Sequence, residues 1–385
     1  MKDRIIKINA KITEIKYEYL LRSNLKQYNI NQVKSGECFN VGAFKLKSGD
    51  NIFGVSTWVS PKRTRSYPFE RVYNTCHLNR KVTIIPLVKD EGKQGDRDYL
   101  QWDTVSLMSL LNIYVIICWY DKAEKSPRYQ NKITNQQYSY EYIYNKLKDL
   151  ESYQSDALHW NVKQVDDLSL VSQKIREFYF EKVPNELGVE MKSVIAYDKK
   201  MAIITRDAES FKSSSRSASV SAQRREAVSI QPKENVIFEK GMINIKNRIG
   251  GEYYWTVDEL VLMDDNVYLI EKKHGRNTLP TISDIKDGFL KNVLYSNINS
   301  AQIGNKTVNV VPSMGLTGGK SKRVLTTKDD LESKNPKDFN LSDKKYKEIK
   351  TIFNEAKVNG INIFIANHKD LTEERQREIL RSFTF

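Results

Sequence analysis

The stretch "VDELVLMDDNVYLIEKKHG", residues 257–275, decides the fold of the C-terminal half. Two strand-like apolar runs are separated by Asp264, Asp265 and Asn266, a turn signal, so the pattern predicts a β-hairpin. Asp258 lies on the first strand. Glu271 and Lys273 end the second strand, two positions apart, and therefore share a face. The hairpin is thus expected to bring two carboxylates and a lysine together.

The C-terminal half is predicted to form a hairpin, a helix and a strand. Residues 252–263, 266–273 and 360–369 are predicted strands, and residues 282–299 and 372–383 are predicted helices. Upstream, the apolar runs 81–92 and 113–121 flank a helical pattern over 99–112, which predicts a parallel β-α-β unit. Residues 138–153 and 167–183 are also predicted helices. The fold class is therefore α/β, of mixed α+β type.

The length of 385 residues suits two domains. Residues 207–235 are rich in serine and arginine and poor in apolar side chains, so they are expected to form a linker or mobile loop. This places an N-terminal domain at 1–206 and a C-terminal domain at 236–385.

The chain is strongly basic, with a formal net charge of +14. A basic surface attracts polyanions, so DNA or RNA is the first partner to consider, although a lysine-rich composition also arises from an AT-rich genome. The sequence shows neither a signal peptide nor an apolar run of membrane-spanning length, so a cytoplasmic protein with no membrane partner is expected. Three widely spaced cysteines predict neither a disulfide framework nor a structural zinc site.

The chemistry of the hairpin residues points to phosphodiester hydrolysis. Paired carboxylates such as Asp258 and Glu271 bind Mg²⁺, which prefers hard oxygen ligands and lowers the pKa of a bound water. A nearby lysine, here Lys273, positions or deprotonates the attacking water. A solvated hairpin edge, with Lys272 and Lys273 pointing into water, is the alternative.

The string Asp258, twelve residues, Glu271-x-Lys273 resembles the PD-(D/E)xK phosphodiesterase superfamily, with Val257 where that family has proline. The resemblance implies an αβββαβ restriction-endonuclease-like core over 236–385, with Asp258 and Glu271 as Mg²⁺ ligands and Lys273 as the residue that orients or activates water. It also implies an additional glutamate on the first helix of that core, which should begin just after the linker. The candidates for it are Glu234, Glu239 and Glu252.

Cations interleaved with aromatic side chains in "WVSPKRTRSYPFERVYNT", residues 58–75, favour DNA contact by the N-terminal domain. The loop "GLTGGKSKR" fails the phosphate-loop spacing and is expected to be either a basic loop near the DNA backbone or a surface turn. The predicted DNA-binding residues are Lys62, Arg63, Arg65, Arg71, Lys320, Lys322 and Arg323.

A second acidic group lies in "KDEGKQGDRDYLQWD", residues 89–103, and leaves open a second metal site in a degenerate nuclease-like core. Its acids are Asp90, Glu91, Asp96, Asp98 and Asp103.

These patterns together predict a sequence-specific, Mg²⁺-dependent endonuclease of double-stranded DNA, resembling bacterial type II restriction enzymes, in which residues 1–206 recognise DNA. A non-catalytic basic DNA-binding protein and a repair or nicking nuclease of the same superfamily are the alternatives. No methyltransferase glycine loop appears, so a separate cognate methyltransferase is expected. Whether the enzyme works as a homodimer is left open.

Overall fold

The computed structural model describes residues 5–62, 66–228, 238, 240–247, 251–275, 279–318, 324–339 and 341–383. The chain folds into two compact units. The composite unit comprises residues 1–23 and 220–385, and the central unit comprises residues 24–219. The predicted boundaries differ from these, because residues up to 23 fold with the C-terminal half.

The central unit contains a five-stranded sheet in the order β2-β3-β4-β5-β8. β5 and β8 are parallel, with Val82 opposite Tyr114, and α3 connects them, which confirms the predicted β-α-β unit. The strands and helices are β2 (Gln27–Asn29), α1 (Gln32–Ser35), β3 (Ala43–Ser48), β4 (Asn51–Thr57), α2 (Ser66–Thr75), β5 (Arg80–Pro86), β6 (Val88–Asp90), β7 (Arg97–Tyr99), α3 (Trp102–Leu110), β8 (Tyr114–Cys118), β9 (Tyr120–Lys125), β10 (Ile133–Tyr138), α4 (Tyr140–Glu151), α5 (Ala157–Lys163), α6 (Leu168–Glu177), α7 (Val183–Leu187) and α8 (Val194–Ile204).

The expectation of a linker or mobile loop over 207–235 is wrong for residues 208–228, which form helix α9 (Ala208–Val228). The physical reason is a buried stripe at four-residue spacing, made by Phe211, Ser215 and Ser219. Ser215 accepts a hydrogen bond from the Trp102 amide at 2.8 Å, so serine hydroxyls anchor the helix where apolar side chains were expected. The boundary between the two units falls within α9. Residues 229–235 of the predicted linker lie outside the described residues.

The composite unit contains a nine-stranded sheet with the main path β12-β11-β1-β15-β16-β14-β13. β18 pairs with β16, and β17 pairs with β18. The strands and helices are β1 (Ile6–Ile12), β11 (Gly241–Asn247), β12 (Glu252–Val257), β13 (Glu259–Met263), β14 (Asn266–Gly275), α10 (Ile282–Tyr295), β15 (Ser300–Ile303), β16 (Lys306–Gly318), β17 (Leu325–Thr326), α11 (Asp343–Val358), β18 (Asn362–Ala366) and α12 (Glu373–Arg381). Both ends of the main path, β12 and β13, are consecutive in the chain and meet at Asp258.

The N-terminal strand β1 completes this sheet. It pairs in parallel with β11 and antiparallel with β15. The residues after it are also held in the composite unit, because the buried carboxylate of Glu355 accepts hydrogen bonds from the amides of Leu20 and Leu21 at 3.0 and 2.7 Å. A segment from the start of the chain is therefore part of the C-terminal fold.

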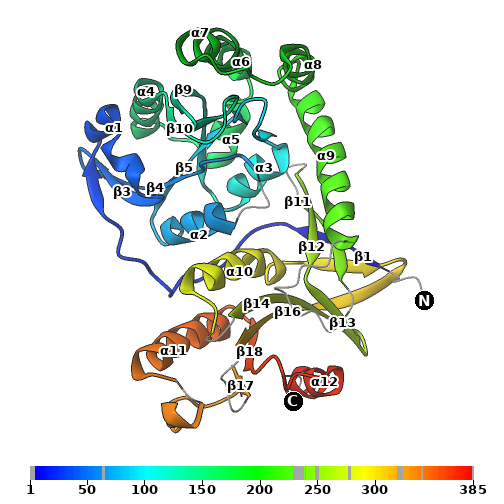
Figure 1. Cartoon of the computed structure of the whole chain (residues 1–385). Helices are drawn as coiled ribbons and strands as arrows, with labels where there is room; N and C mark the ends of the chain where they lie inside the picture. Colours follow the sequence, from blue (N-terminus) through cyan, green and yellow to red (C-terminus); the bar gives the residue numbers. More distant parts are fainter. Residues whose placement is uncertain are drawn as a thin grey trace. The chain divides into compact units, whose positions relative to one another are not determined.

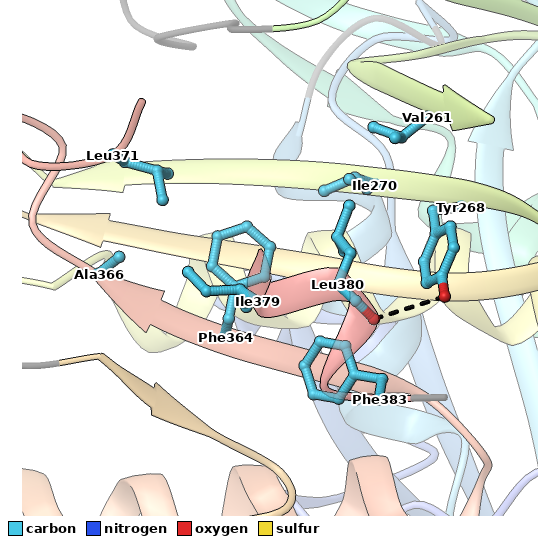
Figure 2. Close-up of a cluster of buried hydrophobic side chains, with 9 residues drawn as sticks. All are labelled: Val261, Tyr268, Ile270, Phe364, Ala366, Leu371, Ile379, Leu380 and Phe383. Carbon is cyan, nitrogen blue, oxygen red and sulfur yellow. Dashed lines mark hydrogen bonds between the residues drawn. The ribbon is translucent and has the colours of Figure 1, made fainter. Parts of the chain in front are cut away.

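Strand β14 is covered on both faces. α10 follows β14 and leads through β15 to β16, which is parallel to β14, and it packs against both β14 and β16 (Figure 1). α12 packs on the other face over an apolar cluster, shown in Figure 2, where the Tyr268 hydroxyl donates to the Leu380 carbonyl at 3.4 Å. The buried members of this cluster are Val261, Tyr268, Ile270, Phe364, Ala366, Leu371, Ile379, Leu380 and Phe383.

Candidate functional site

The predicted hairpin is present as β13 and β14. Met263 pairs with Asn266 across a two-residue turn, and Asp264 takes the left-handed conformation, with φ of 56°, that such tight turns use. Glu259 pairs with Ile270, so continuing this register places Asp258 opposite Glu271. The turn sequence and the alternation of apolar residues are thus sufficient to set the register that brings the acids together.

Asp258 lies at a break in the predicted strand 252–263. Before it, β12 pairs with β11, and after it β13 pairs with β14. The Asp258 carboxylate Oδ2 accepts a hydrogen bond from the Lys272 amide at 2.9 Å. This contact fixes the first acid against the strand that carries Glu271 and Lys273.

Helix α10 lies on the face of β14 that presents Glu271 and Lys273. Its start is set by a capping box, in which the Thr281 side chain accepts from the Asp284 amide and Asp284 accepts from the Thr281 amide. Gly288 permits the close approach of the helix, because a Cβ atom there would lie 3.1 Å from Lys273 Cε and 3.4 Å from Glu271 Cγ. The missing side chain at this position makes room for the charged groups.

α10 adds two charged residues to the site, Asp287 and Lys291, one helical turn apart. Lys273 Nζ lies 2.5 Å from Asp287 Oδ2 and 3.1 Å from Glu271 Oε1. Lys291 Nζ donates to both Glu271 oxygens, at 2.7 and 2.9 Å. The Glu271 side chain is only 1% exposed, whereas that of Lys291 is 23% exposed. The site is therefore a compact ion-pair cluster, and Lys291 is its more exposed cation.

Burial and charge oppose one another in this cluster. Burial alone would raise the pKa of Glu271, but the ammonium groups of Lys291 and Lys273 lower it below its ordinary value. Burial would lower the pKa of Lys273, but Glu271 and Asp287 raise it. For Asp287, burial outweighs the nearby lysines, and its pKa is raised. Glu271 is accordingly a carboxylate and Lys273 an ammonium at neutral pH.

A second ion pair lies on the opposite face of β14, under α12. Lys272 Nζ is 3.4 Å from Glu259 Oε2, and both side chains are fully buried. Gln376 of α12 completes the group, because it accepts from Lys272 Nζ at 3.0 Å and donates to Glu259. Lys272 was expected to be solvated on the alternative interpretation of the hairpin, and this expectation is wrong, since the strand is covered on both faces.

The structure thus brings together the three predicted catalytic residues Asp258, Glu271 and Lys273. Sequence reasoning missed Asp287 and Lys291. The available signal was an acid and a base four positions apart in the predicted helix "ISDIKDGFLKN", which directly follows the hairpin. Of the proposed additional glutamates, Glu234 and Glu239 lie outside the described residues. The first described element after the predicted linker is strand β11, so the helix expected there is not found among the described residues. Glu252 lies at the start of β12, 3.7 Å from Lys246.

Five predicted DNA-binding residues, Arg63, Arg65, Lys320, Lys322 and Arg323, lie outside the described residues. Lys62 lies 3.9 Å from Asp98. The Arg71 guanidinium donates to the Thr57 carbonyl at 2.8 Å and stacks over the Tyr67 ring. Arg71 therefore has a structural role in the central unit.

Four of the five acids of residues 89–103, namely Asp90, Glu91, Asp98 and Asp103, have separate side-chain partners. Asp90 pairs with Arg97 at 2.5 Å, and Asp103 accepts from Ser219 at 2.9 Å. Burial alone would raise the pKa of Glu91, but hydrogen bonds and charges from Lys89 and Lys132 lower it from 4.5 to about 2. Within the described ranges, which include Asp258, Glu271 and Asp287 as well as this segment, no three His, Cys, Asp or Glu side chains are grouped so that they could hold a metal ion. The idea that this segment forms a second metal site gains no support from these contacts.

Comparison with protein-family models, curated proteins and solved structures gives no match to this chain. In the part of the chain that the structure describes, no helix is long and apolar enough to cross a membrane.

Proposed function

We propose that this protein is a Mg²⁺-dependent endonuclease of double-stranded DNA, of the type II restriction class. The observation that carries the proposal is the convergence of Asp258, Glu271 and Lys273 on adjacent strands, with the carboxylate of Glu271 almost completely buried and held ionised. Buried ionisable groups with shifted pKa values gather at functional sites, although structural ion-pair networks shift pKa values as well.

The order of elements supports the same proposal. If β12 and β13 are counted as one strand interrupted at Asp258, the order is α9, β11, β12–β13, β14, α10 and β16. With β15 left out, this order is consistent with the αβββαβ order that the superfamily resemblance implies, and in that way it supports the proposal.

The donor set suits Mg²⁺, because Asp258 and Glu271 supply hard carboxylate oxygens from neighbouring strands. A bound Mg²⁺ would activate water and stabilise charge on a phosphodiester. Lys273, whose pKa is raised, acts in the proposed reaction as an ammonium that orients water or phosphate by donating hydrogen bonds. It does not act as the base in this state. Asp287 holds that ammonium in place and is therefore a positioning residue.

The net charge of +14 supports a polyanionic substrate, and the central unit is the candidate for DNA recognition. Replacing Arg63 and Arg65 together should weaken DNA binding and reduce the slope of log affinity against log salt by about one for each phosphate that the protein no longer neutralises. Assembly as a homodimer, a separate methyltransferase and a cytoplasmic location belong to the same proposal.

One observation favours the second candidate, a DNA-binding protein without catalysis. Both oxygens of Glu271 are engaged by Lys291, so the cluster is also a self-sufficient set of ion pairs. The proposals differ in whether the acids are required for cleavage.

The test incubates purified protein with plasmid and phage DNA, with and without Mg²⁺. Discrete fragments that need Mg²⁺ are expected, and Asp258→Asn and Glu271→Gln should each abolish them without weakening DNA binding in Ca²⁺. Glu332→Gln is the matched control, since Glu332 pairs with Lys350 at 2.7 Å on an exposed surface. Intact DNA accompanied by a gel shift would favour the binding-only candidate, and full cleavage by both site variants would refute this hairpin as the active site.

A further inference from the structure

Lys291, the more exposed cation of the site, lies where it can compete with a metal ion. It comes from α10, and its ammonium group is bound to both oxygens of Glu271 at 2.7 and 2.9 Å. Those oxygens carry the lone pairs that a divalent cation would use. The Glu271 carboxylate cannot bind both the Lys291 ammonium group and a divalent cation fully at the same time.

The net charge of the cluster also indicates that Lys291 competes with a divalent cation. Counted as formal charges, the three acids Asp258, Glu271 and Asp287 and the two lysines Lys273 and Lys291 sum to −1. Without Lys291 the sum is −2, which one divalent cation neutralises. With Lys291 in place, the same cation would leave a positive cluster, which is unfavourable in a buried site.

Lys291 can move out of the ion-pair cluster more easily than Lys273 can. Lys273 is held between Glu271 and Asp287, and its side chain is 16% exposed. Lys291 is more exposed, and Glu271 is its only ion-pair partner within the described residues. Its flexible four-carbon stem allows the ammonium group to move into solvent while the methylene groups stay packed.

We propose that Lys291 is an internal counter-ion of the site, which holds Glu271 in the metal-free protein, is displaced when a divalent cation binds, and so lowers the affinity of the site for that cation. This inference rests on the proposed function, because it takes Asp258 and Glu271 as metal ligands. It adds a regulatory property to them: metal affinity is set by a residue that is not itself a ligand.

The test measures Mn²⁺ binding by calorimetry at constant ionic strength, without DNA. Lys291→Met keeps the apolar stem and removes the charge, and it should tighten Mn²⁺ binding by about tenfold or more. Lys350→Met is the control, since Lys350 is also helical, similarly exposed and 2.7 Å from its glutamate partner. The control should bind Mn²⁺ as the unsubstituted protein does. Equal or weaker binding by Lys291→Met would overturn the inference.

A second measurement needs no substitution, in case Lys291→Met does not fold. The rate at which an amine-reactive reagent modifies Lys291 is followed by mass spectrometry, with and without Mn²⁺. Displacement predicts faster modification of Lys291 when Mn²⁺ is bound, with Lys350 unchanged. An unchanged rate at saturating Mn²⁺ refutes displacement.

The two proposals fail in different ways. If the unsubstituted protein binds Mn²⁺ and Glu271→Gln abolishes that binding, the metal site stands, and only the Lys291 results decide the inference. If neither the unsubstituted protein nor Lys291→Met binds Mn²⁺, the metal site and the inference are both refuted.

Discussion

The two charges of the buried ion pair under α12 should be strongly coupled in their effect on stability. Lys272 and Glu259 are fully buried, with Nζ and Oε2 3.4 Å apart, and Gln376 bonds to both. The perturbations are Lys272→Met, Glu259→Gln and the two together. Methionine retains most of the lysine stem, and glutamine retains the shape of glutamate, so the changes remove charge with little change in volume.

The expected magnitude follows from the separation. Two unit charges 3.4 Å apart attract by about 5 kcal/mol at an effective dielectric constant of about 20. Removing one charge leaves the other buried without its counter-charge, so each single variant should lose about 3–5 kcal/mol. Lys272→Met should lie near the lower limit, because Gln376 still donates to Glu259. The double variant should lose no more than about 2 kcal/mol, since replacing a buried pair with neutral groups is often close to neutral.

The assay must report on the composite unit alone, because two units can unfold in separate steps. Trp255 is the only tryptophan in residues 1–23 and 220–385, and it is buried. Incorporation of 5-fluorotryptophan gives Trp255 a ¹⁹F resonance. This resonance is assigned by its absence from the spectrum of the Trp255→Phe variant. The intensities of its folded and unfolded signals in increasing urea then give the free energy of unfolding.

Additive losses in the double variant would refute this account of the pair, because they would show that the two charges do not interact. The exposed pair Lys350 and Glu332 is the control. The same cycle there should give a coupling energy below about 1 kcal/mol.

Three further predictions concern single positions. Thr281→Ala should destabilise the composite unit by about 1 kcal/mol, because it removes the capping box that Thr281 forms with Asp284; no loss in urea unfolding would contradict this. Gly288→Ala should change stability by less than about 1 kcal/mol, since the helix preference of alanine offsets the contact with the flexible end of Lys273; a loss above about 2 kcal/mol would show that α10 cannot adjust. Glu91→Gln should cost stability above pH 4.5, because the pKa of Glu91 is lowered to about 2 in the folded protein, and the difference from the unsubstituted protein should disappear as pH falls towards 2; a difference independent of pH would contradict the ion pairing.

Local patterns predicted the parts of the fold that depend on neighbouring residues. The hairpin of β13 and β14 followed from its turn residues and apolar runs, and α10 followed from its amphipathic spacing. These elements place Asp258, Glu271 and Lys273 together without further information.

Features that depend on distant contacts were not predicted. Asp287 and Lys291 join the site only because the crossover lays α10 on β14, and α9 is helical because its serines meet polar partners elsewhere in the chain. The interruption of the strand at Asp258 also could not be predicted from neighbouring residues, because it arises where the chain changes its pairing partner from β11 to β14. Strands β15 and β16 were missed because tertiary pairing, not local composition, defines them.

The position of β1 has a consequence for synthesis in the cell. Ile6 pairs with Gly241, 235 positions later, so β1 leaves the ribosome long before its partner strand exists. At about 5–20 residues per second, that delay is roughly 10–50 s. During this time the central unit can be completed, while Ile8, Ala10 and Ile12 of β1 still lack the sheet that buries them. The nascent chain therefore carries an unpaired apolar strand through most of translation, when chaperone binding to that segment would protect it from aggregation.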